Sequence, residues 1–144
     1  MVVLAAAISG QFGGDEWYQA VNQPSWNPSV PVMALAWALF YVVMGIAGWL
    51  VWDAKGRGAS IAIGWWFFQL LLGIVWSLVF FGLQRIGWAL AVMSLWVLVS
   101  LIVANAFRFA KMEAALLMAA VVGWLTFNWV LNFFQWHLNG GGSG

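Results

Sequence analysis

Four long segments of this chain contain no charged residue. They cover residues 31–52, 59–83, 86–107 and 114–139. Each is at least as long as the roughly 20 residues that a helix needs to cross about 30 Å of hydrocarbon. Transmembrane strands alternate polar and apolar positions over about 10 residues, and these segments do not alternate. The pattern therefore predicts membrane-spanning helices at approximately 31–52, 60–82, 86–107 and 114–138.

The N-terminal segment is apolar but short. Residues 1–12 fall short of a full span and lack the basic residues that open a signal peptide, so hydropathy alone leaves open whether they cross the membrane. Counted as a first helix at approximately 1–13, they make the chain an all-α, five-transmembrane-helix bundle in a single domain, residues 1–139. The remaining residues, 140–144, are Gly and Ser and are typical of a flexible tail.

The connections differ in length, and only the first is long. The later ones are short, which predicts that consecutive helices are antiparallel neighbours. The connection from Gly13 to Val30 is polar, yet it contains Trp17, Tyr18 and Trp26. Disordered segments have few aromatic residues, and long loops are often functional. We therefore expect a long ordered loop between helices 1 and 2 that caps one end of the bundle.

Composition agrees with a multi-pass integral membrane protein. The chain is 65% hydrophobic and 6% charged, with a mean hydropathy of +0.95, whereas soluble domains carry roughly 25% charged residues. A net charge of +1 from scattered cations provides no basic stripe, so a nucleic-acid partner is excluded. The chain has no Cys, which excludes disulfides and thiolate metal sites.

The few cations predict an orientation. In a five-helix chain the second and fourth connections share a side, and the cations there are Lys55, Arg57, Arg108 and Lys111. The opposite side holds Arg85, together with Asp15 and Glu16 in the long loop. Because basic loops stay on the cytoplasmic side, we expect the long loop to face outward, most simply in a bacterial cell membrane.

Small residues recur four positions apart on several segments, a spacing that allows helices to approach closely in lipid. The pairs are Ala34 and Ala38, Gly73 and Ser77, Gly87 and Ala91, and Ala115 and Ala119. Packing within one bundle is the simpler interpretation. A homodimer face is the alternative.

The predicted spans offer little for acid–base or metal chemistry. They contain no Asp, Glu, Lys or Arg, and their one titratable group of interest is His137 near the end of the last span. A lone His beside Trp136 is more simply an interfacial residue than a haem ligand. A retinal Schiff base and a carboxylate proton relay are unsupported. We expect no metal site and no required cofactor.

Aromatic and amide residues form stripes at helical spacing. Trp37 and Tyr41 are one turn apart and share a face. Two further stripes are Gln69, Gly73, Trp76 and Phe80, and Trp124, Asn128, Leu131 and Gln135. Amides on such stripes should face protein or a cavity rather than lipid. A pocket lined by Trp37, Tyr41, Trp76, Trp124 and Asn128 would suit a flat hydrophobic ligand. The alternative is that these aromatics fill a core or form a membrane belt.

The loop and the helix after it resemble a known family. Residues 15–28 read DEWYQAVNQPSWNP and residues 36–45 read AWALFYVVMG. Together they resemble the translocator protein family, also called tryptophan-rich sensory proteins (TspO/MBR). Further along, the residues that fit the family are Gln69, Leu70, Trp76, Phe80, Phe81, Gly82, Trp96, Trp124, Leu131 and Asn132. The resemblance covers nearly the whole chain in order.

The resemblance implies a five-helix membrane protein, commonly a homodimer, that binds porphyrins in a pocket under the first loop. Animal members also bind cholesterol and synthetic ligands. By position, the implied ligand-binding residues are Tyr18, Trp26, Trp37, Tyr41, Gly73, Trp76, Ser77, Trp124 and Asn128. Some bacterial members promote light-dependent porphyrin breakdown, and tryptophans at the positions of Trp37 and Trp124 are implicated in that activity.

The chain also departs from the family pattern. Where the family has Lys-Pro and a double proline in the loop, this chain has Gln23-Pro24 and Pro28-Ser29. A third-helix Asn of the family is replaced by Gly73, and a Pro-Tyr pair is replaced by Ala120-Val121. The chain has no Tyr, Lys or Arg after Glu113, so the cholesterol-recognition pattern is missing. We expect a reshaped pocket, in which Trp76 and Trp129 take up volume that Asn and Pro-Tyr would define.

These observations predict a protein that binds a planar hydrophobic ligand, most consistent with a porphyrin or haem, for sensing or transport. The ligand would stack on Trp37 and Trp124 beneath a gate formed by residues 17–28. One alternative is light-dependent porphyrin degradation that uses those two tryptophans. The other is a structural or assembly protein whose tryptophans only pack and anchor in the bilayer.

Overall fold

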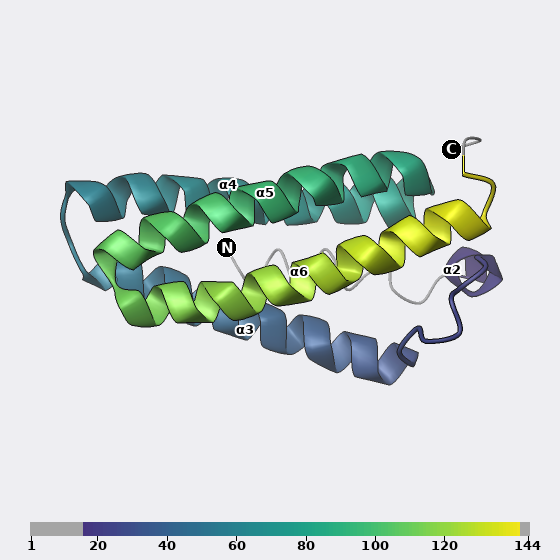
Figure 1. The fold of residues 1–144 in the computed structure, drawn as a ribbon, viewed down its shortest axis with the longest axis horizontal. Coiled ribbons are helices and arrows are strands. Elements are labelled where there is room, and N and C mark those ends of the chain that lie inside the picture. The colour runs from purple at the N-terminus through teal and green to yellow at the C-terminus, as the bar shows by residue number, and fades with distance from the viewer. Residues whose placement is uncertain (1–15, 142–144) are drawn as a thin grey trace.

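The computed structural model describes residues 16–141, apart from the side chain of Arg57, and all regular structure in this range is helical (Figure 1). The elements are α2 Glu16–Ala20, α3 Val30–Asp53, α4 Arg57–Ser77, the π-helical turn η1 Leu78–Gly82, α5 Ile86–Ala110 and α6 Met112–Leu138. The expected first helix at 1–13 and most of the Gly/Ser tail lie outside the described residues.

Four helices are long and apolar enough to cross a membrane: Val30–Asp53, Gly58–Gly82, Ile86–Ala110 and Met112–Leu138. They correspond to the four predicted spans. α5 and α6 both extend further than predicted into the connection between them. α5 runs to Ala110 because Arg108 continues the helix, and α6 begins at Met112. A cation in the last turn of a helix interacts favourably with its terminal carbonyl groups. The total of five spans stays a prediction.

The four long helices form a ring of antiparallel neighbours. α6 packs most extensively on α5 and also on α3, while α4 packs on α5 and more lightly on α3. Between them lies a core of large side chains with no exposed surface, which includes Met44, Met93, Trp96, Met118 and Leu125. The lighter contact between α3 and α4 leaves room for a cavity bordered by α3, α6 and the end of α4.

Polar side chains tie the helices together inside the core. The Ser100 hydroxyl donates to Gln69 Oε1 at 2.8 Å, and Gln69 Nε2 lies 3.8 Å from the Met118 sulfur. The indole N–H of Trp66 donates to the carbonyl of Met44 at 3.1 Å. Each bond joins two different helices, so Gln69 faces protein rather than lipid, as its position on a stripe predicts.

α4 does not end as a regular helix. Its last turn, η1, widens to π-helical geometry, and the Leu83 N–H reaches back to the Leu78 carbonyl at 2.8 Å. Such turns are rare and occur frequently at functional sites. The extra residue in the turn carries Phe80 and Phe81 toward the interior at the end of the bundle near α2.

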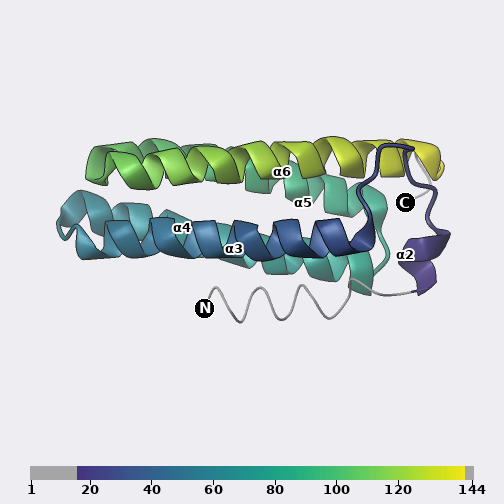
Figure 2. The ribbon, with the colours of Figure 1, turned by 90° about the horizontal axis from the view of Figure 1, so that it is seen from below.

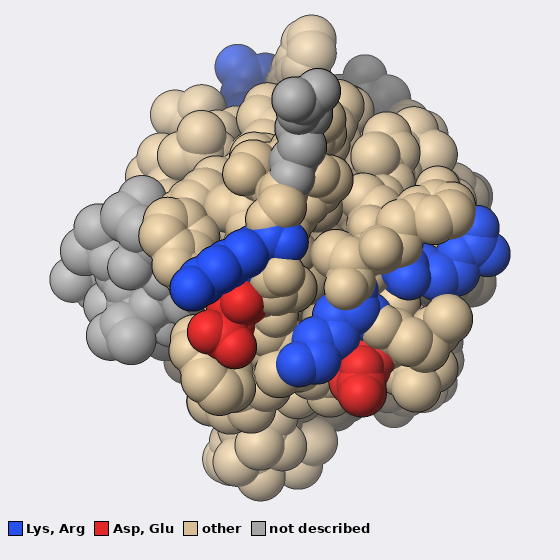
Figure 3. Space-filling model, turned by 90° about the vertical axis from the view of Figure 1, so that its left-hand side faces the viewer, with Lys and Arg blue, Asp and Glu red and all other residues tan. Residues whose placement is uncertain are grey.

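The two ends of the bundle differ in charge. Lys55, Arg108 and Lys111 lie where α3 meets α4 and α5 meets α6, beside Asp53 and Glu113, and Figure 3 shows this charged end. Figure 2 shows α2 and its connection to α3 at the other end, where α6 finishes. The second and fourth predicted connections therefore share an end, as expected.

Candidate functional site

A cavity of about 360 Å³ lies at the α2 end of the bundle. α3 and α6 form its sides, η1 and the end of α4 form its back, and α2 with the segment after it forms its cap. Its lining residues are Tyr18, Pro28, Val30, Met33, Ala34, Trp37, Ala38, Tyr41, Trp76, Phe80, Phe81, Asn128, Leu131, Asn132 and Gln135. The volume falls at the lower end of the range for small-molecule sites.

Two small residues of α3 make room for this cavity. Ala34 and Ala38 are one helical turn apart and both line it. Their spacing was interpreted from the sequence as a helix-packing seam. In the structure both residues line the cavity, so a larger side chain at either position would reduce its volume.

Contacting indoles form one wall of the site. The Trp37 ring is stacked on Trp76 at 5.7 Å between centroids and on Trp96 at 6.1 Å. Trp124 meets Trp37 edge-on at 5.8 Å, from the side away from the cavity. Offset and edge-to-face pairs of this kind contribute about 0.5–1.5 kcal/mol each beyond their burial. The exposed face of Trp37 is thus held rigidly.

Gly73 allows this cluster to form. A Cβ atom at position 73 would lie 2.7 Å from the Trp96 ring, a separation that side chains do not tolerate. Trp96 therefore occupies the space beside Gly73, where the sequence led us to expect Trp76 and Trp129. Trp129 instead donates its N–H to the Ser94 hydroxyl at 2.7 Å and stacks on Phe133, on the α5 side of α6.

Amides of α6 form the polar side of the cavity. The Trp76 N–H donates to Asn132 Oδ1 at 3.1 Å, and Asn132 Nδ2 donates to the Ile86 carbonyl at 3.3 Å. Asn128 Nδ2 donates to the Trp124 carbonyl at 2.8 Å. These bonds fix the orientation of each amide, and a buried amide held this way orients a ligand rather than adapting to it.

The cap is attached to the end of α6 by side-chain amides. Gln135 Nε2 donates to Gln23 Oε1 at 2.6 Å. The Asn22 N–H donates to Asn139 Oδ1 at 3.1 Å, and Asn139 Nδ2 donates back to the Asn22 carbonyl at 3.0 Å. Aromatic contacts add to this attachment, with Tyr18 5.6 Å from the Phe81 ring. The cap is therefore ordered where it covers the cavity.

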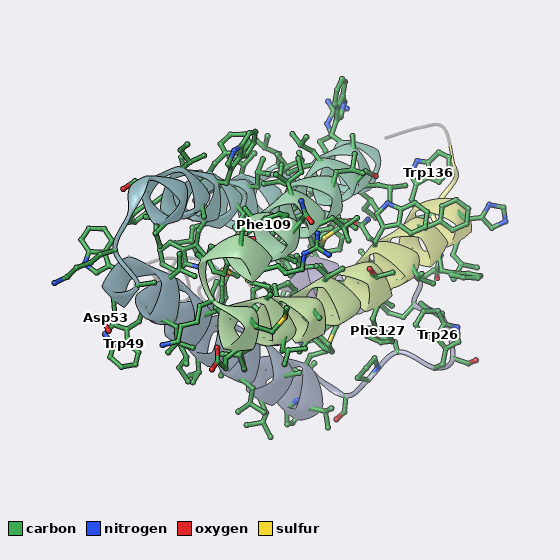
Figure 4. All side chains as sticks on the ribbon, turned by 60° about the vertical axis from the view of Figure 1, so that its left-hand side comes forward. Trp26, Trp49, Asp53, Phe109, Phe127 and Trp136 are labelled. Carbon is green, nitrogen blue, oxygen red and sulfur yellow. The ribbon has the colours of Figure 1, made fainter. Side chains whose placement is uncertain are left out.

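The structure brings five of the nine predicted site residues to the cavity wall: Tyr18, Trp37, Tyr41, Trp76 and Asn128. The other four lie elsewhere. Gly73 and Ser77 are buried in the core, Trp124 lies behind Trp37, and Trp26 packs on Phe127 and Phe134 of α6 outside the cavity, as Figure 4 shows for Trp26 and Phe127.

Several lining residues were not among the predicted site residues. Leu131 and Gln135 lie on the stripe that begins at Trp124, and Asn132 is one turn after Asn128, so helical spacing could have identified all three. Phe80 likewise lies on the stripe that begins at Gln69, whereas Phe81 follows it in the π-helical turn η1. No local sequence signal marks that turn.

The lining determines what chemistry the site offers. Aromatic rings, aliphatic side chains, amides and tyrosine hydroxyls line the cavity. Within residues 16–141, no group of three His, Cys, Asp or Glu could hold a metal ion. His137 lies outside the lining, exposed and stacked on Phe133. The lining can thus stack on a planar ligand and orient it through hydrogen bonds.

Membrane-spanning helices around an aromatic cavity, covered at one end by an ordered cap, define an integral, multi-pass membrane protein with a candidate site for a small lipophilic molecule. The model of the TspO/MBR family matches residues 1–137. The chain belongs to the TspO/MBR family.

The chain is also similar to proteins from several organisms. The tryptophan-rich sensory protein of Cereibacter sphaeroides is 36% identical over 87% of this chain and 78% of its own length. The translocator protein of Homo sapiens is 32% identical, over 91% and 79%. The tryptophan-rich protein TspO of Archaeoglobus fulgidus is 31% identical, over 96% and 93%.

Proposed function

We propose that this protein binds a planar hydrophobic ligand, a porphyrin or related tetrapyrrole, in the cavity between α3 and α6, for sensing or transport across a bacterial cell membrane. In this proposal residues 1–13 supply a fifth membrane helix. Stacking and amide contacts suffice for binding, so no resident cofactor is required.

The observation that carries the proposal is the position of Trp37. Its ring lines the cavity while Trp76, Trp96 and Trp124 contact it from other sides. A ligand that stacks on Trp37 therefore meets a surface that is already ordered, and pre-organised surfaces lose less entropy on binding. The amides of Asn128 and Asn132 stand on the opposite wall, where they can orient polar groups at the ligand's edge.

A fluorescence titration tests the proposal. Detergent-solubilised protein is mixed with protoporphyrin IX in the dark, and quenching of tryptophan emission is followed to saturation. We expect Trp37→Ala to weaken binding by about tenfold or more, which corresponds to roughly 1.4 kcal/mol, because the stacking surface is lost. Trp37→Phe keeps an aromatic ring, so its affinity for protoporphyrin IX should lie between that of Trp37→Ala and that of the unchanged protein.

Trp49→Ala is the matched control. Trp49 lies on the same helix, is 63% exposed and is remote from the cavity, so its loss removes one indole from the signal without changing the site. Helical content by circular dichroism verifies that each variant is folded. Quenching that does not saturate, or that Trp37→Ala and Trp49→Ala alter equally, would contradict the proposal and favour a structural role.

The homodimer implied by the resemblance is part of the same proposal. α3 carries an exposed apolar stripe at helical spacing, formed by Leu35, Leu39, Val42, Ile46 and Trp49, which lipid or a second copy would cover. The molar mass of the protein in detergent, measured by light scattering, distinguishes one copy from two.

A further inference from the structure

The cations of this chain stand away from the cavity. The sequence has five Lys and Arg, and none of them precedes Lys55. Lys55, Arg108 and Lys111 lie at the end of the bundle opposite the cap (Figure 3), and Arg57 is the first residue of α4 at that end. The fifth, Arg85, is exposed on the connection between η1 and α5 and is not a lining residue. No Lys, Arg or His is present among the described residues that line the cavity.

Acidic residues are instead close to the cap in sequence. Glu16 is the first residue of α2, two positions before the lining residue Tyr18, and Asp15 precedes it. The Glu16 carboxylate on α2 adds negative rather than positive charge near this end of the molecule, and like charges repel.

The polar groups of the cavity are also poorly suited to a carboxylate. Each amide nitrogen of Asn128, Asn132 and Gln135 already donates to a protein oxygen, at 2.8, 3.3 and 2.6 Å respectively. A carboxylate accepts hydrogen bonds and cannot donate them. An ionised carboxylate bound here would have no positive charge beside it, and burying an ionised group without a charged partner is strongly unfavourable.

Gln23 occupies the position from which a cation could reach this region. Its Oε1 accepts the hydrogen bond from Gln135 Nε2, and Gln135 is a lining residue. A lysine at position 23 would replace this neutral amide with an ammonium beside the Gln135 side chain, which lines the polar end of the cavity. With glutamine there, the contact between cap and cavity is neutral.

We propose that this cavity selects a planar ligand without ionised carboxylates and that Gln23 determines this specificity. This inference rests on the proposed function. The ligand class is an uncharged tetrapyrrole, such as an esterified porphyrin, in preference to a porphyrin with free propionates. The uncharged side chains of Gln23 and Gln135 would lie beside the uncharged edge of the ligand at the polar end of the cavity.

A matched pair of ligands tests the inference. Protoporphyrin IX carries two carboxylates, and its dimethyl ester has the same macrocycle without charge. Both are titrated in the dark into protein in an uncharged detergent, and the ratio of their dissociation constants is measured. We expect the diester to bind at least about tenfold more tightly, a difference of roughly 1.4 kcal/mol.

Gln23→Lys should reverse much of this preference. The added ammonium lies at the polar end of the cavity, so affinity for the dicarboxylate should rise about tenfold while affinity for the diester stays within about twofold of that of the unchanged protein. Gln19→Lys is the control, because Gln19 is exposed on α2 and is not a lining residue. It adds the same charge to the cap and should leave the ratio unchanged.

The outcomes separate the two proposals. If neither porphyrin binds saturably, the proposed function fails and this inference fails with it. If both bind and the dicarboxylate is as tight as the diester or tighter, the proposed function stands and the specificity is overturned. An equal response of Gln23→Lys and Gln19→Lys would also overturn the role of Gln23, since a general charge effect would then explain the change.

Discussion

At the scale of single residues, Gly73 decides how the aromatic cluster packs. Trp96 has no exposed surface and lies against Gly73, where any side chain would collide with its ring. Trp96 in turn stacks on Trp37. A glycine on one helix therefore positions an indole on the cavity wall through an intermediate ring that the ligand does not touch.

We expect Gly73→Ala to destabilise the protein. Overpacking a filled core costs about 1–3 kcal/mol, and the better helix propensity of alanine recovers about 1 kcal/mol at most. The change should lower the thermal midpoint measured by circular dichroism in detergent, and it should weaken porphyrin binding by displacing Trp96 and then Trp37.

Gly64→Ala provides the matched comparison, because Gly64 lies on the same helix and a Cβ there meets nothing within 4 Å. This variant should be as stable as the unchanged protein or slightly more stable. Equal midpoints for the alanine variants at positions 64 and 73 would show that Trp96 relaxes freely and that Gly73 is not required for the cluster.

At the scale of elements, the cap is held by few bonds to the end of α6. The long helices share extensive apolar contacts, whereas the segment after α2 is attached by the amide bonds of Gln23 and Asn22 and by the contacts of the half-exposed Trp26 ring with α6. Elements with few buried contacts open at low free energy. The cap is thus the part of the described structure best suited to open for a ligand.

We expect Asn139→Ala to loosen the cap without unfolding the bundle. The Asn22 N–H loses its acceptor, at a cost of about 1 kcal/mol, so its hydrogen exchange should accelerate by about fivefold. Exchange measured by mass spectrometry on peptides that contain residues 21–27 reports the change.

Asn105→Ala is the control for the cap variant. The Asn105 side chain accepts a hydrogen bond from Arg108 at 3.0 Å at the opposite end of the bundle. Exchange in the cap should be unaffected by this variant. If Asn139→Ala leaves cap exchange unchanged, the hydrogen bonds to Asn22 do not hold the cap closed.

At the scale of the whole molecule, the distribution of charge predicts the orientation in the membrane. Lys55, Arg108 and Lys111 stand at one end and the cap at the other. Because cytoplasmic loops retain Lys and Arg, the cap and the cavity should face away from the cytoplasm.

Single cysteines can test this orientation, since the chain has none of its own. Ser25→Cys places an exposed thiol on the cap, and Ser60→Cys places one near the charged end. In intact bacterial cells, a membrane-impermeant maleimide should label Ser25→Cys directly and Ser60→Cys only after permeabilisation. The opposite labelling pattern would mean that the chain inserts the other way round.

The amino-acid sequence by itself determined the four described spans, the end that carries the cations, and five of the residues that line the cavity. The spans follow from uninterrupted apolar length, and four of the lining residues follow from helical periodicity, both of which are local properties of the chain. Tyr18 was implied by the family resemblance. The family resemblance rested likewise on residues such as Trp37 and Tyr41, whose spacing can be counted directly.

Only the tertiary structure decided which side chains meet between helices. It placed Trp96 beside Gly73, set Trp124 edge-on against Trp37 and outside the cavity lining, and added Phe81 of η1 to that lining. It also joined Gln23 to Gln135 across more than 100 positions of sequence. Such contacts depend on how close the helices approach and how they are rotated, because rings and amides from distant segments must share one space.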